Sequence, residues 1–130
     1  MNPIDFFKTV YLGDRQCKQL IIDGVASEVR LQIDLISRVR GNHWDYYADE
    51  DISNGFLVFE GVTKFELMPQ GPLPNDRIDI VSVSETTVKG LYRFEFSLDA
   101  ISADHDDEVT LTVIATAFCL ADAAGQKIRA

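Results

Sequence analysis

The stretch EVRLQIDL, residues 28–35, decides the fold class of this chain. Apolar residues occupy every second position and polar or charged residues fill the positions between, namely Val29, Leu31, Ile33 and Leu35 against Glu28, Arg30, Gln32 and Asp34. Because successive side chains of a strand point to opposite faces, this period of two predicts a half-buried antiparallel strand. Its charged row alternates in sign and is interpreted as a solvated face.

Further strands are predicted on both sides of this stretch. Upstream, residues 17–22 lead into Asp23-Gly24, a dipeptide suited to a tight hairpin turn. Downstream, residues 56–60 and 63–68 flank Gly61, and the two prolines of GPLPN mark a loop or sheet edge before residues 78–83. The last third alternates over residues 92–98 and is β-branched over 109–120, with a polar hairpin loop at 102–108 between them.

The amino terminus predicts a helix over residues 3–12. Asn2 is a suitable cap, Pro3 suits the first helical position, and Asp5 places negative charge in the first turn. The complete pattern predicts one mainly β (α+β) domain over residues 1–130, with an antiparallel sheet over 16–120 and a tail over 121–130. About seven strands are expected, arranged as a sandwich or a half-closed barrel with the helix against one end.

The charge balance restricts the class of partner. With 21 acidic and 12 basic residues the chain carries a formal net charge of −9. This field repels nucleic-acid phosphates and attracts a basic protein. A role of the charge in solubility alone is the alternative.

Cys17 and Cys119 lie in apolar runs and are expected to be reduced core residues. Neither a basic segment followed by an apolar run at the amino terminus nor an apolar run of about 20 residues occurs. The expected location is therefore the cytoplasm, with no membrane contact.

The loop NHWDYYADED, residues 42–51, is the candidate partner-binding site, because it mixes aromatic side chains with carboxylates. The residues assigned to it are Trp44, Asp45, Tyr46, Tyr47, Asp49, Glu50 and Asp51. In the alternative interpretation its three aromatic residues fold back and plug the open end of the sheet.

No metal, cofactor or catalytic centre is predicted. Residues 104–108, DHDDE, match no calcium-loop template, and no HExxH or paired CxxC spacing occurs, so a solvated turn is expected there. His43 and His105 have no identifiable partner for nucleophilic catalysis. An enzyme is therefore not expected.

The segments NPIDFFKTVYLGDRQCKQLIIDG, SEVRLQIDLISRVR, NHWDYYADEDI and GFLVFEGV together resemble a family of small uncharacterised bacterial proteins. That family has no established activity, so the resemblance implies no functional residue. The small, acidic, single-domain character is similar to that of immunity proteins, which neutralise toxins delivered by neighbouring bacteria.

Two hypotheses follow. The first is a non-enzymatic protein-binding module, of the immunity type, that neutralises a basic partner. The second is a small-molecule or metal-binding β domain, with its site at the open end of the sheet and His43 or His105 beside carboxylates. The oligomeric state is left open.

Overall fold

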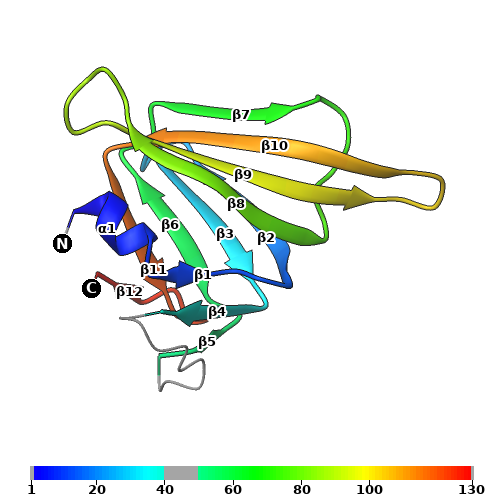
Figure 1. Cartoon of the computed structure of the whole chain (residues 1–130), viewed down its shortest axis with the longest axis horizontal. Coiled ribbons are helices and arrows are strands. Elements are labelled where there is room, and N and C mark those ends of the chain that lie inside the picture. The colour runs from blue at the N-terminus through cyan, green and yellow to red at the C-terminus, as the bar shows by residue number, and fades with distance from the viewer. Residues whose placement is uncertain (1, 40–49, 130) are drawn as a thin grey trace.

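The computed structural model describes residues 2–39 and 50–129, which form one short helix and twelve strands. Figure 1 shows their arrangement. In chain order the elements are α1 (Pro3–Phe7), β1 (Val10–Tyr11), β2 (Arg15–Asp23), β3 (Glu28–Ile33), β4 (Leu35–Arg38), β5 (Ile52–Ser53), β6 (Phe56–Glu60), β7 (Lys64–Met68), β8 (Arg77–Glu85), β9 (Tyr92–Ile101), β10 (Asp106–Ala115), β11 (Ala117–Ala121) and β12 (Lys127–Ile128). The predicted fold class, mainly β with an amino-terminal helix, is confirmed.

The strands form two antiparallel sheets. The larger has nine strands in the order β12-β11-β6-β3-β2-β8-β9-β10-β7, and the smaller has the order β1-β4-β5. In Figure 1, strands β7 to β10 cross over the layer of β2, β3, β6 and β11. The two layers are joined by the short pairing of β2 with β8 at Arg15 and Gln16. The large sheet does not close, since its end strands β12 and β7 do not pair with each other.

The predicted number of about seven strands is wrong. The run over residues 109–120 was expected to be one strand, but it bends at Thr116, so β10 pairs with β9 and β7 while β11 pairs with β6 and β12. Opposite this bend stands Gly61, with φ 63°, where a Cβ would collide with Thr116 Oγ1. Strands β1, β5 and β12 have two residues each, too few to show a period in the sequence.

The expected helix over residues 3–12 ends at Phe7. Asn2 caps it as predicted, since its Oδ1 accepts from Asp5 N at 2.8 Å. The Thr9 hydroxyl donates to Phe6 O at 2.7 Å, and Val10 then pairs with Arg38 of β4. β-Branched Thr9 and Val10 fit an extended backbone better than a helix, which explains the early end.

The carboxyl end of the sheet extends further than the predicted limits of 16–120. Residues 122–126 form a turn closed by the Asp122 N–H, which donates to Gln126 O at 3.0 Å. This turn brings β12 back to pair with β11, with Leu120 opposite Ile128.

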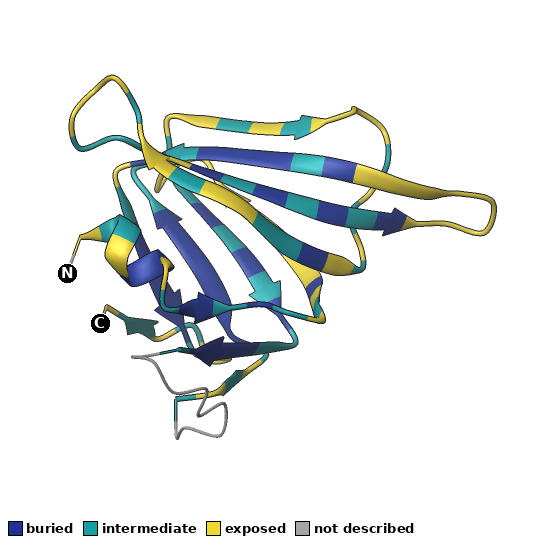
Figure 2. Cartoon of the chain, viewed as in Figure 1, coloured by how far each residue is buried: buried dark blue, intermediate teal, exposed yellow. Residues whose placement is uncertain are grey.

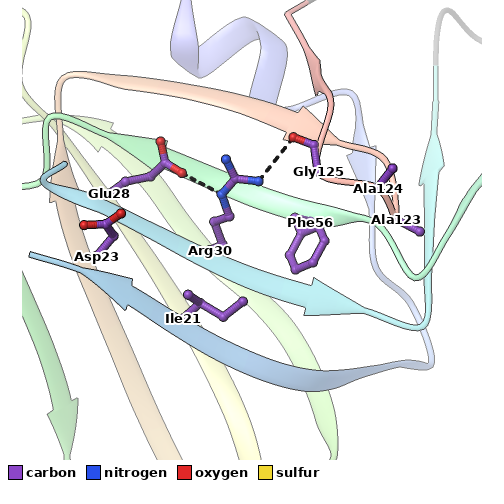
Figure 3. Close-up of a pocket in the computed structure, with 8 residues that line it drawn as sticks. All are labelled: Ile21, Asp23, Glu28, Arg30, Phe56, Ala123, Ala124 and Gly125. Carbon is purple, nitrogen blue, oxygen red and sulfur yellow. Dashed lines mark hydrogen bonds and ion pairs between the residues drawn. The ribbon is translucent and has the colours of Figure 1, made fainter.

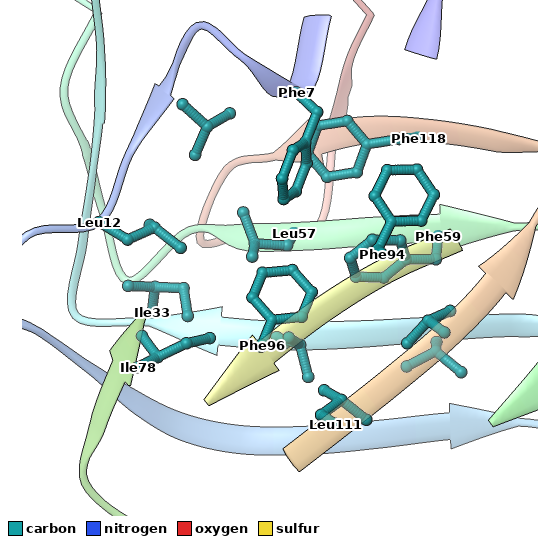
Figure 4. Packing of buried hydrophobic residues seen from close by; sticks show 14 of the residues in the cluster. Phe7, Leu12, Ile33, Leu57, Phe59, Ile78, Phe94, Phe96, Leu111 and Phe118 are labelled. Carbon is teal, nitrogen blue, oxygen red and sulfur yellow. The ribbon is translucent and has the colours of Figure 1, made fainter. Parts of the chain in front are cut away.

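The core lies between the crossing layers and is rich in phenylalanine (Figure 4). Phe94 of β9 contacts Phe59 of β6 with ring centroids 4.9 Å apart, and Phe7 of α1 lies 5.1 Å from both Phe94 and Phe118. These rings meet at steep angles, the edge-to-face geometry that aromatic pairs favour. Helix α1 therefore covers the core between β8 and β11, through its buried phenylalanines.

Both cysteines are buried free thiols, as predicted. No helix among the described residues is long and apolar enough to cross a membrane.

Candidate partner-binding surface

Most of the predicted binding loop falls outside the described residues, namely Trp44, Asp45, Tyr46, Tyr47 and Asp49. Glu50 and Asp51 are described. Glu50 is half-buried and Asp51 is exposed, directly before β5. These two carboxylates thus stand at the edge of the small sheet.

Two arginines that sequence reasoning did not identify contact the small sheet, Arg15 from the start of β2 and Arg38 from within β4. Arg15 Nη2 donates to the buried hydroxyl of Ser37 at 3.1 Å, and its guanidinium lies over the ring of Tyr11. Arg38 is buried, donates from Nε to Thr9 Oγ1 at 2.8 Å and stacks over the Phe6 ring at 4.7 Å. Positive charge therefore lies in and beside the small sheet, next to the point in the chain where the candidate loop begins.

The second acidic stretch forms the end of the β9–β10 hairpin. We call it the acidic hairpin end and define it as Asp99, Asp104, Asp106, Asp107 and Glu108. Figure 2 shows the tip of this hairpin as exposed, and Glu108 stands directly opposite Asp99 in the ladder. A hollow of about 210 Å³ lies among Asp99, Ile101 and residues 106–108.

The negative charge of this end has little local compensation. The sequence contains no Lys or Arg from residue 94 to residue 126. Arg77 is close enough to respond to Asp99, but its pKa is raised first by a hydrogen bond to Asp79, then by the charges of Asp79 and Asp99. No ion pair joins a carboxylate of the acidic hairpin end to a base within the described part of the chain.

Asn75 ties a loop to this hairpin. Its Nδ2 donates to Ile101 O at 2.8 Å, and its Oδ1 accepts from Ile101 N at 2.9 Å. The N–H groups of Asn75 and Asp76 donate to Asp99 O. Ile101, 44% exposed, lines the hollow with the carboxylates, and Leu73, 77% exposed, lies in the loop two residues before Asn75. The surface combines apolar side chains with negative charge, the composition that a basic protein partner requires.

A second charged region lies on the outer face of β3 and β6, where the carboxyl-terminal segment crosses. Lys127 Nζ binds Glu28 and Glu60 at 3.0 and 2.8 Å, and Arg129 Nη1 binds Glu60 at 2.8 Å. Arg30 pairs with Glu28 and donates from Nη1 to Gly125 O, as Figure 3 shows. Unlike those of the acidic hairpin end, both carboxylates of this region are paired with bases.

These contacts lower the pKa of both glutamates. The hydrogen bond from Arg129 is the largest cause for Glu60; burial opposes it and Lys127 adds to it, which brings the pKa of Glu60 to about 2. Burial would raise the pKa of Glu28, but the hydrogen bonds from Arg30 and Lys127 outweigh it, so its pKa is lowered. Both side chains are therefore charged at neutral pH and fix the carboxyl-terminal segment on the sheet.

The thiols are poor nucleophiles. Burial raises the pKa of Cys17 to about 11, and burial together with the charge of Glu60 raises the pKa of Cys119 to about 11. Because the thiolate is the reactive form, both thiols are protonated and inert at neutral pH. In residues 2–39 and 50–129, no group of three or more His, Cys, Asp or Glu side chains is arranged to hold a metal ion.

Comparison with known proteins places the chain in a family. The model of a family of unknown function (DUF6258) matches residues 1–130. The chain belongs to this family. No curated protein and no solved structure matches it. Because the family carries no assigned activity, candidate residues have to come from the chain itself.

Sequence reasoning found the acidity of residues 104–108 but missed the apolar part of this surface. Ile101 ends a regular strand and Leu73 lies between two prolines, so neither shows a pattern of its own. The Asn75 contacts that join them span 26 residues, a separation at which local patterns give no information.

Proposed function

We propose that this chain is a non-enzymatic protein-binding module that neutralises a basic protein partner, in the manner of the immunity proteins of bacteria, and acts in the cytoplasm. The observation that carries the proposal is the acidic hairpin end, a mostly exposed group of carboxylates with an apolar neighbour and with no ion pair to a base within the described residues. Trp44, Tyr46 and Tyr47 are proposed as additional anchors.

Charge distribution supports this choice of surface. Described ion pairs engage the acidic residues Glu28, Glu60, Glu66, Asp79 and Glu95. Within residues 2–39 and 50–129, the remaining excess of negative charge is greatest at the acidic hairpin end, which projects from the body of the protein in Figure 1. A projecting charged surface attracts an opposite charge over about one Debye length, roughly 8 Å at physiological salt.

Affinity requires more than charge, because exposed ion pairs contribute only about 0–1 kcal/mol each. The exposed side chain of Ile101 supplies apolar area next to the carboxylates, and Leu73 supplies more from the loop that Asn75 joins to the hairpin. Burial of this area yields roughly 25 cal/mol per Å² before the costs of association. We therefore propose that the carboxylates increase the association rate and orient the partner. Leu73 and Ile101 would slow dissociation of the complex.

The proposal is tested by affinity capture from a lysate of the native host at low salt, with mass spectrometry of the captured protein. The wild-type chain is compared with a triple variant, D106N/D107N/E108Q, that neutralises the acidic hairpin end. A matched variant, E66Q/D79N/E95Q, removes the same number of charges from described ion pairs elsewhere. We expect a stoichiometric basic protein with the wild type and the matched variant, and its loss with the hairpin variant.

Salt provides a second readout of the same complex. Capture is expected to weaken as salt rises, because exposed opposite charges are screened. The proposal fails if no stoichiometric partner is captured at low salt, or if the hairpin variant captures the same protein as well as the wild type.

A second candidate function is small-molecule binding, favoured by the hollow of about 380 Å³ beside the carboxyl-terminal segment in Figure 3. Its wall places the Arg30 guanidinium 5.9 Å from the centre of the Phe56 ring, next to Ile21 and Asp23. A bound ligand would raise the melting temperature, with about 2.7 kcal/mol of stabilisation at a concentration 100 times its Kd. The test is a thermal-shift screen with calcium, zinc and common metabolites. If none of them changes the melting temperature, this candidate is eliminated.

A further inference from the structure

Strand β7 forms one end of the nine-stranded sheet. Among the described residues it pairs only with β10, and it lies on the outer edge of the sheet in Figure 1. Half of its backbone N–H and C=O groups therefore point away from β10. Such a free edge is a template for pairing with another strand.

The side chains of β7 separate clearly by face. Lys64, Glu66 and Met68 are exposed on one face, while Phe65 and Leu67 are half-buried on the other and pack against the core. Lys64 Nζ and Glu66 Oε2 are 3.9 Å apart, and their side chains remain 56% and 45% exposed. This weak pair within one strand leaves both charges able to form a better contact across strands.

The order of these residues makes the strand complementary to itself. Consider two β7 strands that pair antiparallel and are related by a twofold axis. Directly opposite residues have to lie on the same face of the joined sheet, so the axis has to pass through a residue, which then stands opposite itself. A register centred on Lys64 places two lysines opposite each other, and one centred on Glu66 places two glutamates opposite each other. The register centred on Phe65 places Lys64 opposite Glu66 of the second copy, twice.

We propose that two copies of this chain associate through their β7 strands, in the antiparallel register centred on Phe65, and so join their nine-stranded sheets into one. Opposite charges face each other across strands in this register, whereas like charges would destabilise the other two. Phe65 meets Phe65 of the second copy on the core side. This interaction is independent of binding to a basic protein at the acidic hairpin end.

The surroundings of the edge fit the same register. A hollow of about 220 Å³ lies between the start of β7 and the β2–β3 hairpin, with Ile22 and Val62 in its lining. Ile22 and Met68 are 58% and 51% exposed. In the Phe65-centred register Met68 of one copy lies beside the segment that precedes β7 in the other, so each end of the joined strands covers an exposed methionine.

The test is the mass of the protein in solution, measured by sedimentation over about a hundredfold range of protein concentration. The buffer contains roughly 150 mM salt, which screens the repulsion between two chains that each carry a charge of −9. The wild type is expected to shift from monomer to dimer as the concentration rises. K64E places Glu opposite Glu twice, and E66K places Lys opposite Lys twice. Each single variant is therefore expected to weaken association by about tenfold or more.

An equimolar mixture of K64E and E66K is the decisive sample, because the mixed pair restores opposite charges at both positions and should form a dimer again. Restoration also shows that both variants are folded. K89E, in an exposed turn, has the same change in net charge as K64E and should dimerise like the wild type. E66K also separates local pairing from net charge, because it lowers the net negative charge of each chain. If overall repulsion alone controlled association, E66K would form a stronger dimer than the wild type, whereas the proposed register predicts a weaker one. Monomeric wild type at every concentration, or a mixture that stays monomeric, overturns the proposal.

Discussion

Replacement of Glu60 by glutamine removes the charge that holds the carboxyl-terminal segment but keeps the shape of the side chain. Glu60 binds both Lys127 and Arg129, and its pKa is lowered from 4.5 to about 2. At about 1.4 kcal/mol per pKa unit this corresponds to an upper limit of roughly 3 kcal/mol. Arg129 is 62% exposed, so solvent screening reduces the expected loss for E60Q to about 1–2 kcal/mol at pH 7.

The sign of the pH dependence follows from linkage. A pKa that is lower in the folded state stabilises the fold fully above the unfolded value of 4.5, and this stabilisation is lost as the pH falls toward 2. Urea unfolding of wild type and E60Q from pH 7 to pH 3 should give a difference that shrinks by more than half. D79N breaks an exposed pair and should cost at most about 0.5 kcal/mol. An E60Q difference that is absent at pH 7, or unchanged at pH 3, refutes the reasoning.

Three further predictions concern the core, the bend and the thiols. F94A removes a fully buried ring and should lower the free energy of unfolding by about 3–5 kcal/mol, whereas a loss below about 1 kcal/mol in urea unfolding would contradict the described packing. G61A forces a Cβ toward Thr116 at a positive φ and should cost about 1–3 kcal/mol; an unchanged melting temperature would mean that the bend has another geometry. Cys17 and Cys119 should react with a maleimide at pH 7 only after unfolding, so rapid labelling of the native protein would show that they are accessible.

The sequence predicted those strands whose two faces meet different environments. β3 and β9 alternate because one face of each packs in the core and the other is polar. The interpretation of the charged row of β3 as a solvated face is wrong, since Glu28 and Arg30 are half-buried under the carboxyl-terminal segment. The break between β3 and β4 was missed because the hydrophobic alternation continues through it. Asp34 produces this break, since its Oδ1 accepts from the backbone of both Gln16 and Leu35.

The candidate surface was predicted only in its charged half. The composition of residues 102–108 identified an exposed acidic turn, and the structure confirms that these side chains are exposed. The neighbouring apolar residues depend on Asn75, whose amide joins a loop to a distant strand end. Contacts of this kind follow from tertiary packing and leave no periodic pattern in the sequence.

The most direct test of the proposed function is hydrogen exchange of the complex with the captured basic protein. We expect slower exchange on binding at the amides of Leu73, Asn75 and Asp76 and at those of residues 99–108, where the acidic hairpin end and its apolar neighbours lie. The amides of β3 and β6, the strands that carry the second charged region, should exchange as they do in the free protein. Unchanged exchange over residues 99–108, with protection elsewhere on the chain, would contradict the central claim.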